Sequence, residues 1–133
     1  MTKCTAQEHS WQPALMIMGG GKHMSNSEII TNYMANVTAF YTITNQIAWN
    51  ANHRLPLLTL PDQQADLAHK IKLFEALLAT IRDRRTRNVL RARYGIGMSV
   101  QDAAAFMNLS GATISAITRE ALMQLDLTET PTL

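Results

Sequence analysis

Apolar side chains recur at every third or fourth position over most of the chain, which is the spacing of amphipathic α-helices. The clearest case is a pair of short helices predicted between Ser99 and Leu125 and joined by a tight turn. Ser99 and Ser110 are placed to cap the two helices, and Asn108 suits the left-handed backbone that a sharp turn requires. This order of caps and turn is typical of a helix-turn-helix.

Small and branched residues fall where two crossed helices would touch. Ala103 and Ala104 would let the backbones approach closely, while Ile114 and Ile117 would pack the second helix back onto the first. Leu109 would fill the corner between them. An ordinary helical hairpin shares this apolar spacing and stays open as the alternative, but the joint match favours a DNA-binding helix-turn-helix.

Two further helices are predicted upstream. The first runs from Ser27 to about Asn50, and almost no charge interrupts it after Glu28, so we expect it to be buried on more than one side. It forms either the core of the domain or a dimer contact, and both interpretations stay open. The second runs from Asp62 to about Thr80.

The segment between these two helices contains Pro56 and Pro61, which the interior of a helix does not tolerate. The residues between the prolines are mostly apolar. We therefore expect a buried turn at this point of the chain.

An arginine-rich helix is predicted from Arg82 to Tyr94 and ended by Gly95 and Gly97. Six of the twelve basic residues lie in it, and only Asp83 offsets them. A solvated charged face is the ordinary interpretation of such a run. Because unneutralised guanidiniums repel each other unless a polyanion lies against them, we favour contact with DNA phosphates. The residues assigned to this contact are Arg82, Arg84, Arg85, Arg87 and Arg91.

The pattern divides the chain into four parts. Residues 1–26 contain a run of three glycines among mixed polar residues and are expected to be a disordered leader or an upstream extension. Residues 27–80 are the helical core or dimerisation region, and residues 81–125 are the helix-turn-helix domain. Residues 126–133 are expected to be a flexible tail.

Composition narrows the classes of function. The chain has 133 residues, 47% of them apolar, which suits one globular domain with short tails. Its single cysteine excludes an internal disulfide and fits the cytoplasm, and no apolar run is long enough to cross a membrane. No nucleophile–base pair, metal-ligand cluster or glycine-rich phosphate loop appears, so neither an enzyme nor a cofactor is expected.

The arginine-rich helix and the helix pair together resemble a known family. The pattern is Leu-x-x-Arg-Tyr-Gly starting at Leu90, a glycine turn, and a helix-turn-helix that closes on Arg-x-Ala-Leu-x-x-Leu starting at Arg119. It resembles the fourth region of bacterial sigma factors and the sigma-like domains of small phage and plasmid transcription regulators, over the C-terminal third of the chain. The resemblance implies transcription control through DNA.

Two weaker resemblances point in the same direction. The proline-bounded segment and the helix after it are similar to the Trp repressor family, and the arginine-rich helix with its serine-capped hairpin is similar to small regulators of fimbrial operons. A co-repressor pocket of the Trp repressor type would need cationic residues from two helices. Lys70 could stand for one of them, but Ala116 falls where the second is expected, so no tryptophan site is predicted.

We therefore expect an all-α helical bundle with a C-terminal tri-helical helix-turn-helix unit. It would bind double-stranded DNA as a homodimer, with the second helix of the pair in the major groove. The outward side chains there make no bidentate base contacts, which favours an AT-rich, shape-read site, or else an adaptor that binds RNA polymerase or another regulator. The assigned groove residues are Ser110, Gly111, Ala112, Thr113 and Ser115, with Arg119 on a phosphate.

Overall fold

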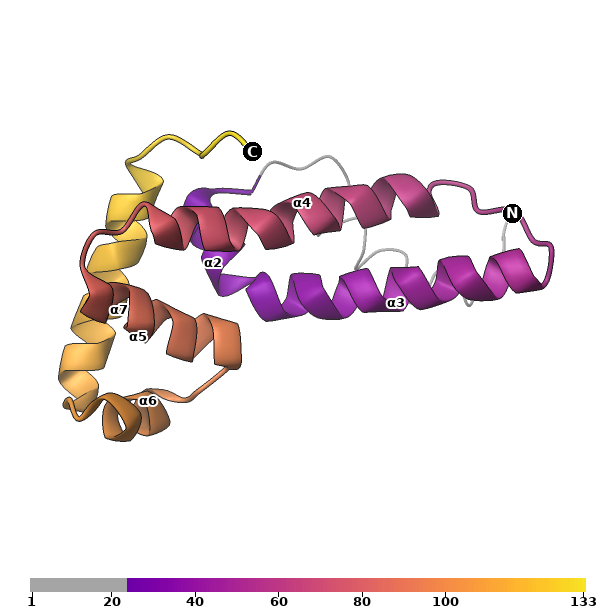
Figure 1. Cartoon of the computed structure of the whole chain (residues 1–133). Helices are drawn as coiled ribbons and strands as arrows, with labels where there is room; N and C mark the ends of the chain where they lie inside the picture. The colour runs from indigo at the N-terminus through magenta and orange to yellow at the C-terminus, as the bar shows by residue number, and fades with distance from the viewer. Residues whose placement is uncertain (1–23) are drawn as a thin grey trace.

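The computed structural model describes residues 24–133, and every regular element in this range is helical (Figure 1). The elements are α2 (Asn26–Thr31), α3 (Tyr33–Asn52), α4 (Leu60–Ala79), α5 (Arg84–Leu90), the π-helical segment η1 (Arg91–Ile96), α6 (Val100–Met107) and α7 (Gly111–Asp126). The predicted all-α class with a C-terminal helix-turn-helix is confirmed. Most of the predicted leader lies outside the described residues.

Helices α3 and α4 form a long antiparallel hairpin that extends away from the cluster of α5, α6 and α7 (Figure 1). We expected a single helix from Ser27 to about Asn50. The structure instead has two helices, α2 and α3, and the first of them begins at Asn26. Ser25 caps α2 in a reciprocal capping box with Glu28, in which each side chain accepts a hydrogen bond from the other residue's backbone N–H. The chain then leaves the helical conformation at Asn32, which has φ of −99° and ψ of 10°, before α3 begins.

The turn between α3 and α4 lies on the surface, so the expected buried turn is wrong. Leu58 is 77% exposed and adopts a left-handed backbone, with φ of 53°. Leu60 alone is buried in this stretch, and it already belongs to α4. Pro61 occupies the first turn of α4, where the missing N–H would have no intrahelical partner in any case.

One hydrophobic core joins the N-terminal and C-terminal halves of the described chain. It is built from side chains of α2, α4, α5 and α7, and Tyr33 stacks on Phe74 with ring centroids 3.9 Å apart. The core therefore crosses residue 81, where we placed a boundary between two regions. Its buried members are Ile29, Ile30, Leu73, Phe74, Leu77, Leu78, Leu90, Ala121 and Leu125.

Polar contacts bind α2 to the end of α7. The buried Asn26 amide donates hydrogen bonds to the carbonyl oxygens of Leu125 (2.8 Å) and Thr128 (3.0 Å). Its own oxygen accepts one from the Thr130 hydroxyl at 2.8 Å. Hydrogen bonds of Asn26 with Thr128 and Thr130 thus reach into residues 126–133, the segment that we expected to be a flexible tail.

Candidate nucleic-acid interface

Helices α6 and α7 form the predicted pair, and each begins at the predicted serine. The Ser99 hydroxyl accepts a hydrogen bond from the Asp102 N–H (3.0 Å), and the Ser110 hydroxyl accepts one from the Thr113 N–H (3.1 Å). Between them Asn108 has φ of 57° and ψ of 47°, the left-handed conformation that the turn requires. Both caps and the turn residue are therefore confirmed.

A second, smaller hydrophobic core lies where α6 and α7 pack against each other and against α5 and η1. Val89, Ala92, Ala103 and Ile114 are buried in it, and Leu109 fills the corner as predicted. A Cβ atom added at Gly111 would lie 3.5 Å from the Val100 side chain, which shows how closely α7 begins against α6. This packing holds α7 rigidly and leaves its outer face free.

The residues assigned to the DNA groove divide into two sets. Ser110, Ala112 and Ser115 are exposed at the start of α7, and Arg119 is exposed one turn further along. Gly111 and Thr113, by contrast, are half-buried. The Thr113 hydroxyl also shares a hydrogen bond with the Ser110 hydroxyl at 2.8 Å. Gly111 and Thr113 therefore contribute to the structure of the first turn of α7.

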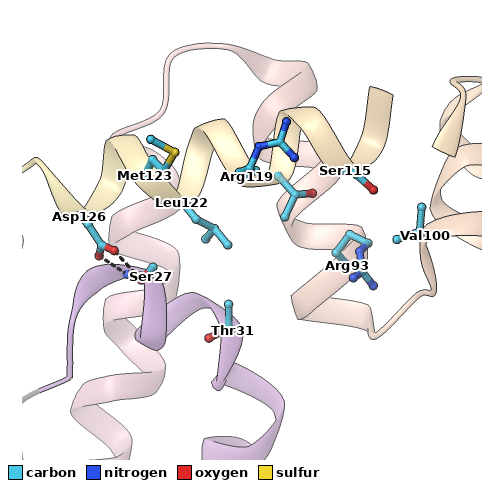
Figure 2. Close-up of a pocket in the computed structure, with 10 residues that line it drawn as sticks. Ser27, Thr31, Arg93, Val100, Ser115, Arg119, Leu122, Met123 and Asp126 are labelled. Atoms are coloured by element: carbon cyan, nitrogen blue, oxygen red, sulfur yellow. Dashed lines mark hydrogen bonds between the residues drawn. The ribbon is translucent and has the colours of Figure 1, made fainter. Parts of the chain in front are cut away.

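A groove of about 440 Å³ runs beside this exposed face, between α7, α2, η1 and the start of α6 (Figure 2). We call it the interface groove; it is lined by Ser27, Thr31, Arg93, Val100, Ser115, Thr118, Arg119, Leu122, Met123 and Asp126. Figure 2 shows Ser115 and Arg119 on α7, and Arg93 of η1 extending toward Val100. Two guanidiniums thus flank one end of the groove.

Arg93 is held in place by the turn that follows η1. Its Nη1 donates to the Met98 carbonyl oxygen at 2.6 Å, and its guanidinium carbon lies 5.3 Å from the centroid of the Tyr94 ring. The Nε atom is buried and has no hydrogen-bond partner among the residues that the structure describes. The guanidinium as a whole borders the interface groove and adds positive charge to it.

Among residues 24–133, the only carboxylate that lines the interface groove lies at its other end. Asp126 accepts hydrogen bonds from the backbone N–H (2.8 Å) and the hydroxyl (2.7 Å) of Ser27. Figure 2 shows this pair across the groove from the arginines, with Leu122 between. The end of the groove near α6 is therefore positively charged. At the end near α2, the Asp126 carboxylate is already hydrogen-bonded to Ser27.

The arginine-rich segment is partly neutralised within the protein, which corrects the expectation of an uncompensated row. The guanidinium of Arg87 donates to the carbonyl oxygens of Ile81 and Arg82, where α4 has just ended. Arg91 forms a salt bridge with Glu75 of α4 at 2.8 Å. Within residues 24–133, the remaining assigned arginines are exposed and make no salt bridge, namely Arg82, Arg84 and Arg85.

Asp83 caps α5, so the one acid of this segment is engaged locally. Its carboxylate accepts hydrogen bonds from the Thr86 hydroxyl (2.7 Å) and the Thr86 N–H (3.2 Å). The hydroxyl bond is the main reason that the pKa of Asp83 lies below its usual value. The nearby cation of Arg85 adds a smaller contribution in the same direction.

The assignment from sequence left out Arg93, which lies in the interface groove together with Arg119. Ordinary helical spacing was assumed from Arg82 to Tyr94, but the chain widens into a π-helix at Arg91. The wider turn rotates every later side chain about the helix axis. The glycines that follow mark the end of the helix but give no signal for this change of winding.

Comparison with known families bears on the same residues. Residues 83–126 match the family described as Sigma-70, region 4. This segment is a sigma-70 region 4-like helix-turn-helix. The match begins at the residue that caps α5 and ends with the last residue of α7. Comparisons with curated proteins and with solved structures gave no match.

In residues 24–133 no three or more His, Cys, Asp or Glu side chains gather where they could hold a metal ion. None of the helices in this range combines the length and the apolarity that crossing a membrane demands.

Proposed function

We propose that this protein binds double-stranded DNA and regulates transcription, with the start of α7 in the major groove. The observation that carries the proposal is the exposed first turn of α7, beside a groove flanked by two arginines, in a segment of the sigma-70 region 4 type. Region 4 is a DNA-binding helix-turn-helix domain. A rigid helix with small side chains and adjacent cations suits a polyanionic duplex.

The proposed contacts follow from which side chains are free. Ser110, Ala112 and Ser115 approach the base edges, where small groups contact any base or a thymine methyl. Phosphates are neutralised by exposed or partly unpaired cations: Arg82, Arg84, Arg85, Arg93 and Arg119. Specificity then comes mainly from the shape of the duplex, which favours an AT-rich site.

Arg87 and Arg91 take a different part in the proposal. Their guanidiniums are engaged with carbonyl oxygens and with Glu75. They fix α5 and η1 against the end of α4, and so they hold the other arginines in place. Their loss would affect DNA binding through the position of these helices.

The test is fluorescence anisotropy with AT-rich and promoter duplexes over a series of salt concentrations. We expect affinity to fall steeply with salt, and the double variant Arg84→Ala with Arg85→Ala to reduce the slope of log affinity against log salt by about 1 per lost contact. Lys72→Ala, an exposed cation on α4, is the matched control and should leave the slope unchanged. Absent or salt-indifferent binding would refute the proposal.

We further propose that α3 makes the protein a homodimer. No charged residue occurs in its 20 residues. The Met34 side chain lies against Gly97, but beyond it positions spaced alternately by three and four residues along the outer side of α3 are all exposed, and they are Thr38, Tyr41, Asn45 and Ala48. This spacing is that of the seam between two paired helices, and the lack of charge lets the seam meet its own copy without repulsion.

Light scattering coupled to size-exclusion chromatography tests the dimer. Tyr41→Glu places a carboxylate on the proposed seam, and we expect it to shift the mass toward the monomer. Ala65→Glu adds the same charge at an exposed position of α4, outside the seam, and should leave a dimer. A monomeric parent protein, or equal effects of the two variants, would contradict the assignment.

A second candidate function is an adaptor that binds RNA polymerase or another regulator. It is favoured by two exposed apolar side chains beside the helix pair, Phe106 of α6 at 70% and Met123 of α7 at 58%. Such side chains serve as anchors in protein interfaces. Capture of RNA polymerase by the parent protein, lost in Phe106→Ala and retained in the Arg84→Ala and Arg85→Ala variant, would support this function over DNA binding.

A further inference from the structure

A second hollow lies on the other side of α7 from the interface groove. Its volume is about 520 Å³, and it shares no residue with that groove. Its floor consists of Ile117, Ala121 and Leu125 of α7, together with Ile81 from the α4–α5 connection. A cavity of this size with an apolar floor falls in the range of ligand sites, about 300–1,000 Å³.

Each threonine hydroxyl at the rim of this pocket already donates a hydrogen bond to another group of the protein. Thr80 donates to the Leu77 carbonyl oxygen (2.6 Å), and Thr128 donates to that of Leu125 (2.8 Å). Thr86 donates to the Asp83 carboxylate (2.7 Å). The three oxygens are therefore left as acceptors for any further hydrogen bond.

The charges around the pocket also favour a ligand that donates hydrogen bonds. Glu120 stands at the rim and forms no salt bridge within the part of the chain that the structure describes. Among the described residues that line the pocket none is an arginine or a lysine, and the Gln124 amide is their one side-chain donor besides the hydroxyls. A ligand that satisfies this lining must bring hydrogen-bond donors and a positive charge.

We propose that this pocket, defined as the acceptor pocket, binds a small amphipathic amine. The apolar body of the amine lies on Ile117, Ala121 and Leu125, and its ammonium group donates to Glu120 and to the threonine oxygens. An anion is disfavoured because it would face Glu120, and a neutral apolar molecule would cover acceptors of the rim without supplying a hydrogen-bond donor. The interface groove, with its two guanidiniums, has the opposite preference.

The site requires no contact with DNA, so it is tested on the full chain without any duplex. Amide shifts in NMR titrations with 2-phenylethylamine and with hexylamine give the affinity and the location. We expect both amines to shift the amides of Ile81 and of residues 117–124. The neutral analogue 2-phenylethanol should bind about three- to fivefold more weakly, the range that a partly exposed ion pair contributes, and 3-phenylpropionate more weakly still.

Glu120→Gln keeps the shape of the side chain and removes its charge. We expect it to weaken both amines by the same three- to fivefold and to leave 2-phenylethanol unchanged. Glu129→Gln, an exposed acid outside the pocket, is the matched control and should change neither. Failure of both amines to bind, equal binding of amine and alcohol, or insensitivity to Glu120→Gln would overturn the proposal while leaving the proposed DNA binding untouched.

Discussion

The turn between η1 and α6 depends on a single glycine. Gly97 has φ of 91°, a left-handed value that L side chains rarely adopt. A Cβ atom there would also lie 2.8 Å from the sulfur of Met34, although the end of that flexible side chain can move aside. Because α6 starts three residues later, this conformation sets the direction in which the helix pair leaves η1.

Gly97→Ala should therefore lower the free energy of unfolding by about 1–2 kcal/mol, mainly through backbone strain. Gly111→Ala is the matched control, since its φ is not positive and the added Cβ would meet Val100 at an ordinary 3.5 Å. We expect no loss of stability from the control. Urea denaturation measures both, and equal losses would contradict the assignment of strain to Gly97.

The cap of α5 makes a pH-dependent contribution to stability. Because the hydrogen bond from the Thr86 hydroxyl lowers the pKa of Asp83, the folded state favours the ionised carboxylate. The stabilisation is complete above the unfolded pKa of about 3.9 and is lost as the pH falls through the lower folded pKa. Below that pH both states are protonated.

Asp83→Ala should accordingly lower the midpoint of thermal unfolding at pH 7, and the difference from the parent protein should shrink below about pH 4. Glu129→Ala removes an exposed acid near the C-terminal end of the described chain. This variant controls for the change in net charge. A deficit that stays constant down to pH 2, or that grows on acidification, would rule out the role of the ionised cap.

At the scale of elements, the helix pair could be predicted closely because its signals are local. Ser99, Asn108 and Ser110 act on backbone groups within four residues, so the sequence alone locates both caps and the turn. The exposed start of α7 follows from the same spacing. The family match to residues 83–126 agrees with this local pattern.

The errors of prediction concern contacts between elements. Burial of the α3–α4 turn was inferred from its apolar composition, yet Leu58 in that turn is exposed. The pairing of Arg91 with Glu75 joins residues sixteen positions apart, which no periodicity shows. The π-helical winding of η1 likewise has no local signal, so the position of Arg93 in the groove could not be foreseen.

At the scale of the whole molecule, α2 ties the ends of the described chain together. The Asn26 side chain makes three hydrogen bonds to residues 125–130 and is 5% exposed. Beside it, the hydrogen bonds between Ser27 and Asp126 close one end of the interface groove. Helix α2 therefore packs against the C-terminal half of α7 and stabilises its position.

Asn26→Ala should cost about 1–3 kcal/mol of unfolding free energy, because the three hydrogen bonds that join α2 to residues 125–130 would be lost. Asn88→Ala, an exposed asparagine on α5 outside the proposed seam, should change stability by no more than about 0.5 kcal/mol. Chemical denaturation followed by circular dichroism measures both. An effect of Asn26→Ala as small as that of the control would show that the hydrogen bonds between α2 and α7 do not stabilise the fold.

The central claim is that one face of α7 meets DNA. It is tested most directly by placing the same negative charge on opposite faces of this helix and measuring duplex affinity by anisotropy. Ser115→Glu puts a carboxylate in the interface groove, whereas Gln124→Glu puts it in the acceptor pocket. We predict a loss of at least about tenfold for Ser115→Glu and less than about threefold for Gln124→Glu. Equal losses, or no loss from Ser115→Glu, would contradict the account.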